Sequence, residues 1–330
     1  MAGPSESPRI AGIIGAGMIG RAWAIVFARA GWAVRLHGTK APKLDEAVRQ
    51  IAQTLRDMRA AGLLDETPDA IVARIRPTDS LRDACDGAAL VQENIPETVE
   101  AKRAIFSAMD EAAPPDAILA SSTSWLPASR FTEDLAGRHR CLVAHPTNPP
   151  NLVPLVEVCP APWTAPDTVD RAIALYREVG QEPVRISREI DGFLLNRIQG
   201  AVLNEVMNLF EQGYASTEDL DKVMKFGLGL RWSFIGPFET IDLNAPGGVE
   251  DYASRYGHTY ARVGREQGPN DWSADVVAKV AAERRQRLDR SRLSERGRWR
   301  DRRLMALRRH LTTQPDTLDD SPVGEGAERA

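Results

Sequence analysis

A histidine and a glutamate in two neighbouring apolar segments are the residues with the most direct chemical potential. His145 lies in "AHPTNPP", and Glu157 lies twelve residues later in "PLVEV". A carboxylate beside an imidazole orients the ring and raises its basicity, so that His145 could take a proton from a substrate hydroxyl. Taken alone, a histidine of this kind is more often a structural residue with satisfied hydrogen bonds. The pair therefore indicates a general base only if the rest of the chain supports an active site.

A glycine-rich motif near the N-terminus is typical of dinucleotide binding. It follows an apolar run at residues 10–14 and opens a segment of helix composition, which is the context that the motif requires. Its three glycines would allow a tight turn, a close approach to a pyrophosphate and packing of the helix on the strand. Free N–H groups and the helix dipole favour an anion there. A glycine-rich turn without a ligand is the weaker alternative. The expected cofactor-binding residues are Gly15, Ala16, Gly17, Met18, Ile19 and Gly20.

The segments around these residues indicate an α/β fold. Residues 33–36 have strand character after the first helix, and so do the later segments "AALVQENIP", "AILASSTS", "CLVAHPTNPP" and "LVPLVEVCP". Helical patterns lie between several of them, for example at 97–112 and 166–179. This alternation predicts a Rossmann-type, doubly wound parallel sheet.

The character of the chain changes after residue 189. Helix periodicity follows in "EIDGFLLNRIQGAVLNEVMNLFEQG", and Ser216 to Asp219 form a capping-box pattern with Asp in place of Glu. From Leu311 onward Pro, Asp, Gly and Glu dominate without a core pattern. We therefore expect a dinucleotide-binding Rossmann domain at 1–189, an all-α domain at 190–310 and a disordered tail at 311–330.

The overall charge of the chain does not suggest a nucleic-acid or membrane partner. The net charge is −4, which gives no reason to expect a nucleic-acid or membrane partner. No run approaches 18 apolar residues, so no membrane span is expected. An arginine-rich run at 284–309 is most simply a solvated helical face or a subunit contact. Nucleic acid is not expected there, because aromatic residues are thinly interleaved.

The three cysteines indicate a reducing environment. Cys85, Cys141 and Cys159 are odd in number and widely spaced, and they fit neither zinc-ligand spacing nor a disulfide framework. We therefore expect no metal site and a cytoplasmic location. The N-terminus "MAGPSESPR" is polar and lacks the apolar segment of a signal peptide. The 330 residues are 43% hydrophobic and 27% charged, which is typical of a globular protein of two domains.

Six stretches, in their order along the chain, resemble the 3-hydroxyacyl-CoA dehydrogenase superfamily. They are "GIIGAGMIGRAWA", "VQENIPETVEAK", "SSTSWLP", "AHPTNPPNLVPLVEV", "DGFLLNRIQ" and "GLGLRWSFIGPFET". Within the superfamily the lambda-crystallin branch, also known as L-gulonate 3-dehydrogenase, is the most similar, because "IDLNAPGG" and "GRWRDRRLMALRRH" resemble it too. The resemblance covers residues 9–310. It implies a Rossmann domain that binds NAD and a helical domain that makes a homodimer.

The resemblance implies catalytic roles for four residues. His145 resembles the general base, and Glu157 resembles its orienting partner. Ser124, in "SSTS", resembles the serine that hydrogen-bonds the substrate oxygen, and Asn196, in "LLNRI", resembles the asparagine that holds the substrate near the dyad. Without the resemblance, Ser124 could cap a turn and Asn196 could be a polar group in helix packing.

Three further residues match cofactor contacts of the superfamily. Glu97 and Lys102 correspond to the contacting pair in "PETVEAK", and Asn148 corresponds to a residue near the nicotinamide. Without the resemblance, Glu97 and Lys102 would be interpreted as surface charges on a helix.

The second strand departs from the superfamily at the position that contacts the adenosine ribose. The superfamily pattern "VKLYD" ends in an aspartate that grips the ribose hydroxyls of NAD, whereas "VRLHG" here ends in Gly38. The change removes two charge-assisted hydrogen bonds, each on the order of 1.5–3 kcal/mol. It also removes repulsion against a 2′-phosphate, for which Thr39 and Lys40 are suitable donors. We therefore expect relaxed specificity or a preference for NADP, against the family expectation of NAD.

Arg231 gives an indication of the substrate class. Acyl-CoA enzymes of the superfamily typically lack an arginine before "GPFE", whereas the lambda-crystallin branch and the carnitine dehydrogenases resemble "GLGLRWSFIGPFE" and act on free carboxylic acids. A guanidinium fork suits bidentate carboxylate binding. Trp125 and Trp232 are more often core or wall residues than the aromatic cage that a carnitine dehydrogenase would need. The stretches "LLNRIQ" and "LNAPGG" favour the gulonate branch.

Together these residues predict an NAD(P)-dependent oxidoreductase. Its reaction would convert the 3-hydroxyl of a small, L-gulonate-like free acid to the 3-keto acid. The alternative enzymes are carnitine 3-dehydrogenase and 3-hydroxyacyl-CoA dehydrogenase. The alternative without catalysis is a crystallin-like structural protein, and the complete set of catalytic residues argues against it, since structural use does not require that set.

Overall fold

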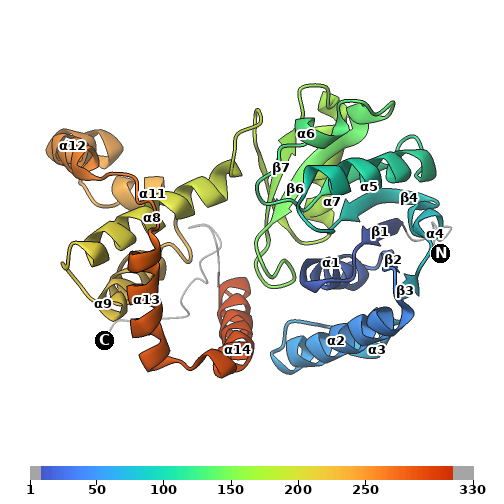
Figure 1. Cartoon of the computed structure of the whole chain (residues 1–330), viewed down its shortest axis with the longest axis horizontal. Coiled ribbons are helices and arrows are strands. Elements are labelled where there is room, and N and C mark those ends of the chain that lie inside the picture. The colour runs from blue at the N-terminus through green and yellow to red at the C-terminus, as the bar shows by residue number, and fades with distance from the viewer. Residues whose placement is uncertain (1–8, 315–330) are drawn as a thin grey trace, which may run out of the picture. The chain divides into compact units, whose positions relative to one another are not determined.

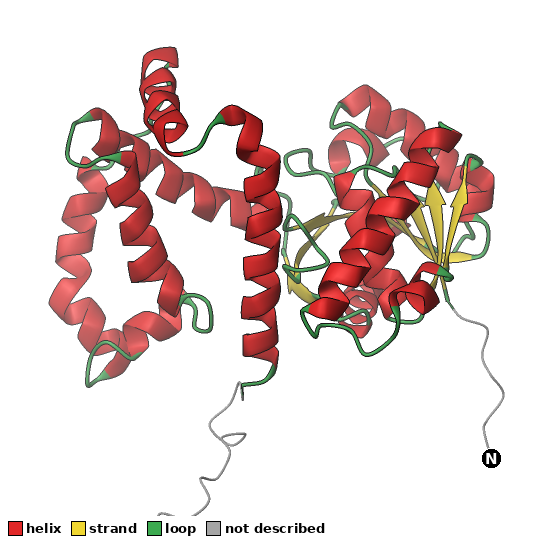
Figure 2. Ribbon diagram, turned by 90° about the horizontal axis from the view of Figure 1, so that it is seen from below, coloured by secondary structure: helices red, strands yellow, loops and turns green. Residues whose placement is uncertain are grey.

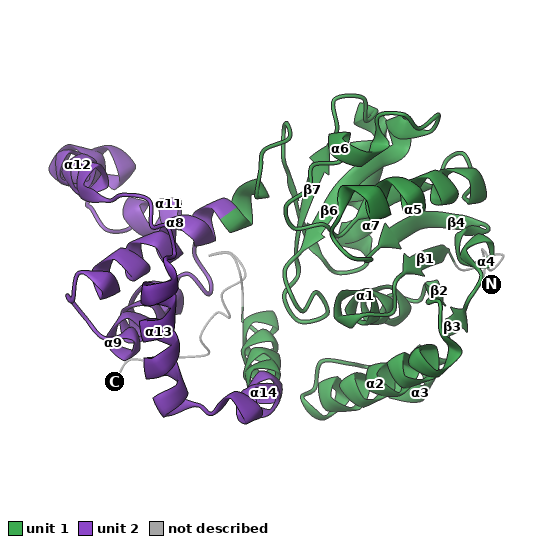
Figure 3. Ribbon diagram, viewed as in Figure 1, with its two compact units in different colours: residues 1–196, 300–330 green, residues 197–299 purple. Residues whose placement is uncertain are grey.

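The computed structural model describes residues 9–314, and these form two compact units (Figure 3). The first unit contains residues 9–196 together with 300–314, and the second contains residues 197–299.

The first unit is an eight-stranded sheet with helices on both faces (Figures 1 and 2). The strand order is β3-β2-β1-β4-β5-β6-β7-β8, and all neighbouring pairs are parallel except β6 with β7. The predicted α/β fold, with a doubly wound Rossmann-type sheet, is confirmed. The strands are β1 (Ile10–Ile14), β2 (Ala33–His37), β3 (Ile75–Thr78), β4 (Ala88–Glu93), β5 (Ile118–Ser121), β6 (Cys141–Pro146), β7 (Leu155–Pro160) and β8 (Glu182–Arg185).

The antiparallel pairing of β6 with β7 corrects the expectation of a wholly parallel sheet. Residues 147–154 connect the two strands. A parallel connection needs a crossover of about a dozen residues or more, usually with a helix, so this short segment can only return the chain in the opposite direction.

The helices of the first unit divide between the two faces of the sheet. The buried residues of α1, α2, α3 and α7 join one hydrophobic cluster, and those of α4, α5 and α6 join the other. Strand residues alternate between the clusters, as Ile13 and Ile14 do on β1. The helices are α1 (Met18–Arg29), α2 (Ala41–Ala60), α3 (Pro68–Val72), α4 (Leu81–Cys85), α5 (Val99–Ala112), α6 (Ser129–Thr132), the 3-10 turn η1 (Arg138–Arg140) and α7 (Pro166–Glu178).

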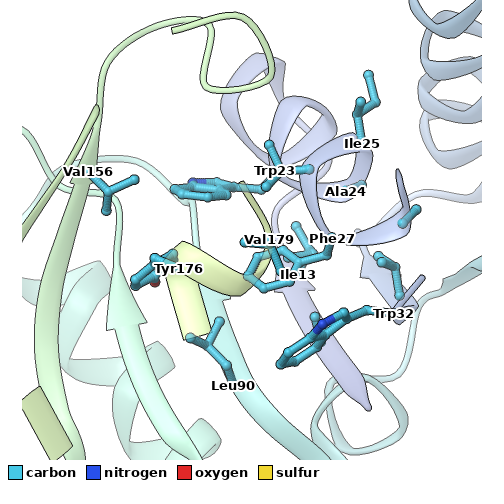
Figure 4. Packing of buried hydrophobic residues seen from close by; sticks show 14 of the residues in the cluster. Ile13, Trp23, Ala24, Ile25, Phe27, Trp32, Leu90, Val156, Tyr176 and Val179 are labelled. Carbon is cyan, nitrogen blue, oxygen red and sulfur yellow. The ribbon is translucent and has the colours of Figure 1, made fainter. Parts of the chain in front are cut away.

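Aromatic side chains fill the centre of the first cluster (Figure 4). Trp23 of α1 packs against Tyr176 of α7 with a ring-centroid distance of 5.5 Å, and Phe27 packs against Trp32 at 5.3 Å. These large buried rings fix α1 on the sheet, and α1 begins at the glycine-rich motif.

The second unit is helical. Its elements are α8 (Phe193–Glu211), which begins in the first unit, α9 (Thr217–Lys222), the π-helical turn η2 (Val223–Leu228), α10 (Gly229–Arg231), α11 (Pro237–Asp242), α12 (Gly248–Glu266), α13 (Ala274–Arg287), η3 (Arg290–Arg292) and the start of α14 (Leu293–Thr312). Ser216 caps α9 by accepting a hydrogen bond from the N–H of Asp219, as the capping-box pattern predicts. Few residues of the unit are buried: Met207, Thr240, Ala245 and Val276 are those between 197 and 299.

The division of the chain differs from the expected boundaries at 189 and 310. The first unit extends to Asn196, and the chain returns to it from Arg300 onward. The return is explained by Met305 of α14, which is 4% exposed and belongs to the first hydrophobic cluster. Leu311 and Thr312, expected in a disordered tail, are helical; residues 315–330 lie outside the described residues. In the described part of the chain, no helix is both long and apolar enough to span a bilayer.

Candidate active site

The predicted dyad is formed by two residues on adjacent strands. His145 on β6 is the register partner of Glu157 on β7, and Nδ1 of His145 lies 2.8 Å from Oε2 of Glu157. The side chains are buried, with 5% and 1% of their surface exposed. Directly opposite residues of an antiparallel pair project to the same face of the sheet, which is why the two groups meet.

The second carboxylate oxygen of Glu157 is fixed by a helix. Oε1 accepts hydrogen bonds of 2.8 Å from the backbone N–H groups of Leu194 and Leu195. These groups lie in the first turn of α8, where N–H groups have no partner within the helix and the dipole favours a carboxylate. Glu157 is therefore a fixed acceptor for Nδ1–H of His145. This arrangement leaves Nε2 as the basic nitrogen, and Nε2 has no hydrogen bond within the described residues.

Ser124 and Asn196 lie close to each other. The Asn196 Nδ2 donates a 2.9 Å hydrogen bond to the backbone carbonyl of Ser124. The Ser124 hydroxyl has no hydrogen-bond partner among residues 9–314, so it remains available to a ligand. The structure therefore links a turn after β5 to the first turns of α8, the helix that also holds Glu157.

Glu97 fixes the turn that carries Ser124. Its Oε1 accepts 2.7 Å hydrogen bonds from the N–H groups of Ser124 and Trp125, and it also accepts the hydroxyl of Thr123. Burial alone would raise the pKa of Glu97, but the hydrogen bonds from Thr123, Trp125 and Ser124 outweigh burial and lower it. The interpretation of Glu97 as an unengaged surface charge is therefore wrong.

Lys102 also forms a polar interaction, but in the interior of the protein. It is 1% exposed, and Nζ lies 2.7 Å from both carboxylate oxygens of Glu93 at the end of β4. Glu93 also accepts the Ser121 hydroxyl at 2.6 Å and the Ile95 N–H at 2.5 Å. The ion pair therefore braces the ends of β4 and β5, and the surface-charge interpretation is wrong for Lys102 as well. Sequence reasoning missed Glu93, although a glutamate inside "ALVQEN" was a visible signal of a buried partner.

The two residues directly after β6 differ in how exposed their polar groups are. Asn148 is exposed directly beyond the strand that carries His145. Thr147 was missed by sequence reasoning: its Oγ1 is buried and has no hydrogen-bond partner in the described structure. A buried hydroxyl without a hydrogen-bond partner is unusual in a folded protein.

A pocket of 1210 Å³ is lined in part by the glycine-rich motif. Gly15 adopts a φ of +98°, and a Cβ there would lie 2.8 Å from the Asn94 carbonyl. A Cβ on Gly20 would lie 1.8 Å from the Gly15 carbonyl, so the helix needs this glycine to approach the strand. At Gly17, by contrast, a Cβ would meet no atom within 4 Å. A glycine is therefore not required by packing at that position, and the open space fits a pyrophosphate over the uncapped N-terminus of α1.

The same pocket is lined by the residues expected to contact the adenosine ribose. Gly38, Thr39 and Lys40 follow β2 there, as predicted. His37 lines the pocket too, and burial lowers its pKa although Asp79 partly opposes the shift. Sequence reasoning missed three charged lining residues, Arg21, Lys43 and Glu46, because helix periodicity alone does not show which side chains face a ligand.

Two family patterns match consecutive parts of the chain. The 3-hydroxyacyl-CoA dehydrogenase NAD binding domain matches residues 10–190, and the C-terminal domain of the same enzymes matches residues 192–286. The chain belongs to the 3-hydroxyacyl-CoA dehydrogenase family. Members of this family are NAD-dependent dehydrogenases that act on CH–OH groups, so this family member is an oxidoreductase.

Similar proteins with known names include a crystallin homolog and two dehydrogenases. A lambda-crystallin homolog of Bos taurus is 44% identical over 313 residues, covering 93% of this chain and 97% of the relative. An L-carnitine dehydrogenase of Burkholderia mallei is 35% identical and covers 75% of each chain. The solved structure of an NAD+-dependent 5-formyl-3-hydroxy-2-methylpyridine 4-carboxylic acid 5-dehydrogenase has a TM-score of 0.81 at 27% identity, covering 94% of this chain and all of the other.

Arg231 lies in the part of the chain that matches the family's C-terminal domain. It ends α10, it is exposed, and it forms no ion pair within residues 9–314. Trp232 is 37% exposed, and Trp125, in the first unit, is 59% exposed. Neither tryptophan is a core residue, so both are open to contacts with a ligand. Within the described residues, no group of three or more His, Cys, Asp or Glu side chains could hold a metal ion.

Proposed function

We propose that this family member oxidises the 3-hydroxyl of a small free 3-hydroxy acid, with L-gulonate as the representative substrate, to the 3-keto acid. The observation that carries the proposal is the buried His145–Glu157 dyad, in which Nε2 of His145 has no hydrogen-bond partner within the described residues. The free hydroxyl of Ser124 and the bond from Asn196 to its turn supply the second half of the site.

In this proposal His145 and Glu157 carry out proton transfer, and Ser124 stabilises the substrate oxygen. Nε2 of His145 takes the proton of the 3-hydroxyl as the carbonyl forms, while Glu157 stabilises the resulting imidazolium through Nδ1–H. The Ser124 hydroxyl donates a hydrogen bond to the substrate oxygen, and Asn196 keeps the Ser124 turn in place. The nicotinamide, when bound, supplies the acceptor for the hydride that leaves the substrate carbon.

The proposed cofactor is NAD or NADP, held by the residues that line the pocket after the glycine-rich motif. Glu97 acts on it indirectly in this proposal, by fixing the turn at Ser124. Lys102 acts by bracing the ends of β4 and β5, where the cofactor pocket and the Ser124 turn meet the sheet. Asn148 is proposed to contact the nicotinamide, because it is exposed three residues beyond the base.

A free acid is favoured over an acyl-CoA because Arg231 carries an exposed guanidinium without an ion-pair partner in the described structure. Such a group suits a carboxylate that arrives with the substrate. The name of the lambda-crystallin relative and its coverage of nearly the whole chain support the gulonate branch. The carnitine dehydrogenase relative supports carnitine as the second candidate, with Trp125 or Trp232 available to contact its trimethylammonium group.

We also infer that the protein acts as a homodimer, in a reducing compartment such as the cytoplasm. Four buried residues among the 103 of the second unit are too few for an independent core, and large apolar side chains such as Phe226, Phe234 and Phe238 are 63–79% exposed. A second copy that covers this surface would complete the core. Sedimentation at micromolar concentration should give a mass of two chains, and a monomer would exclude the dimer. The three free cysteines support the reducing compartment.

A substrate panel tests the proposed reaction. L-gulonate, L-carnitine and 3-hydroxybutyryl-CoA are each assayed with NAD and with NADP, following reduction of the nicotinamide at 340 nm. Turnover with L-gulonate should exceed turnover with the CoA ester by at least an order of magnitude in kcat/KM. A preference for the CoA ester would overturn the free-acid assignment, and a preference for carnitine would select the second candidate.

A further inference from the structure

The ribose end of the cofactor pocket carries an excess of positive charge. Its described lining includes the cations Arg21, Lys40 and Lys43, and Glu46 is its only carboxylate. None of the three cations forms an ion pair within the described residues; the Arg21 guanidinium donates instead to the Ala16 carbonyl at 3.1 Å. Burial lowers the pKa of Arg21, and the negative charge of Glu46 opposes this shift only in part.

The carboxylate of Glu46 is already engaged on its own helix. Arg49 donates to Oε2 through Nη2 at 2.7 Å and through Nε at 3.0 Å, and Gln50 donates to Oε1 at 2.6 Å. These hydrogen bonds, first from Gln50 and then from Arg49, lower the pKa of Glu46. Because Glu46 has its own cation in Arg49, it leaves the charge of Lys40 and Lys43 largely uncompensated.

The surroundings of Gly38 disfavour a carboxylate side chain at the end of β2. A Cβ on Gly38 would lie 3.0 Å from Cδ2 of Leu44 and 3.6 Å from Cβ of Ala16, so any side chain there would press on the pocket wall. Thr39 and Lys40 follow directly, and Lys40 is the N-cap of the 20-residue helix α2. The N-terminal dipole of α2 therefore adds to the field of the lysines.

We propose that this end of the pocket binds the 2′-phosphate of an adenosine ribose, so that NADP is the preferred cofactor. The inference rests on the proposed dehydrogenase function for the presence of a dinucleotide in the pocket. Lys40 and Lys43 bind the phosphate, Thr39 offers it a hydroxyl donor, and Arg21 adds positive charge between the phosphate and the glycine-rich loop. The ribose hydroxyls of NAD would find no free carboxylate there.

Calorimetric binding of three nucleotides to the full chain tests the phosphate site without any turnover. Adenosine 2′,5′-bisphosphate should bind at least tenfold more tightly than 5′-AMP, because a charged phosphate contact has that value. Adenosine 3′,5′-bisphosphate carries the same charge at a different position and should bind no better than 5′-AMP. Equal binding of 2′,5′-bisphosphate and 5′-AMP, or equal binding of the two bisphosphates, would overturn the proposal.

Three substitutions assign the effect to residues. Lys43→Met should weaken binding of the 2′,5′-bisphosphate roughly tenfold and leave 5′-AMP unchanged. Glu46→Gln should strengthen it, a gain that damage to the fold cannot imitate. Arg56→Met, an exposed cation further along α2 that does not line the pocket, is the matched control. A response of Lys43→Met that equals the control would remove the lysine from the site.

The outcomes separate this inference from the proposed function. Selective bisphosphate binding without turnover of any 3-hydroxy acid would uphold the phosphate site and reject the substrate. Turnover of the acid with NAD alone, together with unselective nucleotide binding, would uphold the reaction and reject the phosphate site.

Discussion

His145 and Glu157 are direct register partners on antiparallel strands β6 and β7, and their side chains meet at 2.8 Å. The relationship depends on backbone pairing rather than on a flexible loop. A register shift of one residue would turn one of the two side chains to the opposite face of the sheet. The geometry of the dyad is therefore as rigid as the sheet itself.

Replacement of the base should affect the chemical step alone. His145→Gln should lower kcat by roughly 10²–10⁴, which is the range for loss of a general base. Binding of the reduced cofactor, followed by nicotinamide fluorescence, should stay within about twofold. Near-normal turnover in this variant would remove His145 from the role of base.

Glu157→Gln should lower kcat because it changes the tautomer of His145. The glutamine oxygen would remain with the N–H groups of Leu194 and Leu195, so its amide N–H₂ would face Nδ1 of His145. Nδ1 would then have to accept a hydrogen bond from the amide. The ring proton would therefore be on Nε2, and Nε2 could no longer take a proton from the substrate. We expect a loss in kcat on the order of 10²–10⁴ at pH 7. A loss below tenfold would show that the orientation of the ring, rather than its tautomer, is what Glu157 supplies.

Glu97 offers a matched pair of variants. Glu97→Ala removes the acceptor for the turn at Ser124, and we expect it to raise KM for the hydroxy acid and to lower stability by about 1–3 kcal/mol. Glu97→Gln keeps an acceptor oxygen and should retain most of both properties. Because the folded-state pKa of Glu97 is lowered, its stabilising contribution is present above the ordinary value of 4.5 and is lost as the pH falls through the lower value. Lowering the pH should therefore narrow the difference in unfolding free energy between wild type and Glu97→Ala, and a constant difference from pH 6 to pH 3 would contradict the role.

Substitution of Arg231 should lower kcat/KM more for a free acid than for its ester. Arg231→Met should lower kcat/KM for a free 3-hydroxy acid by roughly 10–10², the value of charge-assisted hydrogen bonds to a carboxylate. The methyl ester of the same acid should lose much less, and Arg231→Lys should rescue only partly because a point charge does not reproduce the fork. Equal losses on acid and ester would reject carboxylate binding and favour a structural role for the arginine.

Met305 should contribute to the stability of the first unit. Met305→Ala should lower the free energy of unfolding by about 2 kcal/mol or more, because the side chain is buried in the first hydrophobic cluster. Leu307→Ala, on the same helix but 42% exposed, is the control and should change it by less than about 0.5 kcal/mol. Chemical denaturation measures both, and equal effects would mean that α14 does not belong to this core.

Sequence patterns could predict the elements whose signal is local. The glycine-rich motif in its strand–turn–helix context indicated the pocket beside β1 and α1. A histidine near a strand end and a glutamate twelve residues later indicated the dyad. The antiparallel turn between β6 and β7 was also predictable, since eight residues cannot hold a crossover helix.

Interactions between distant parts of the chain could not be predicted in this way. Glu97 bonds to residues 26 to 28 positions away, and nothing in "PETVEAK" indicates them. The buried pair of Lys102 with Glu93 depends on where α5 packs against β4. Met305 was missed for the same reason: an arginine-rich helix appears solvent-exposed until the single face that packs against the first unit is known.

The place of Met305 in that cluster has a consequence for the order in which the protein is made. Residues 9–196 leave the ribosome first, but the side chain that completes their core is synthesised more than a hundred residues later, after the whole second unit. The nascent Rossmann unit therefore keeps part of its apolar surface uncovered until α14 has been synthesised. It acquires its full stability only after the second unit has left the ribosome.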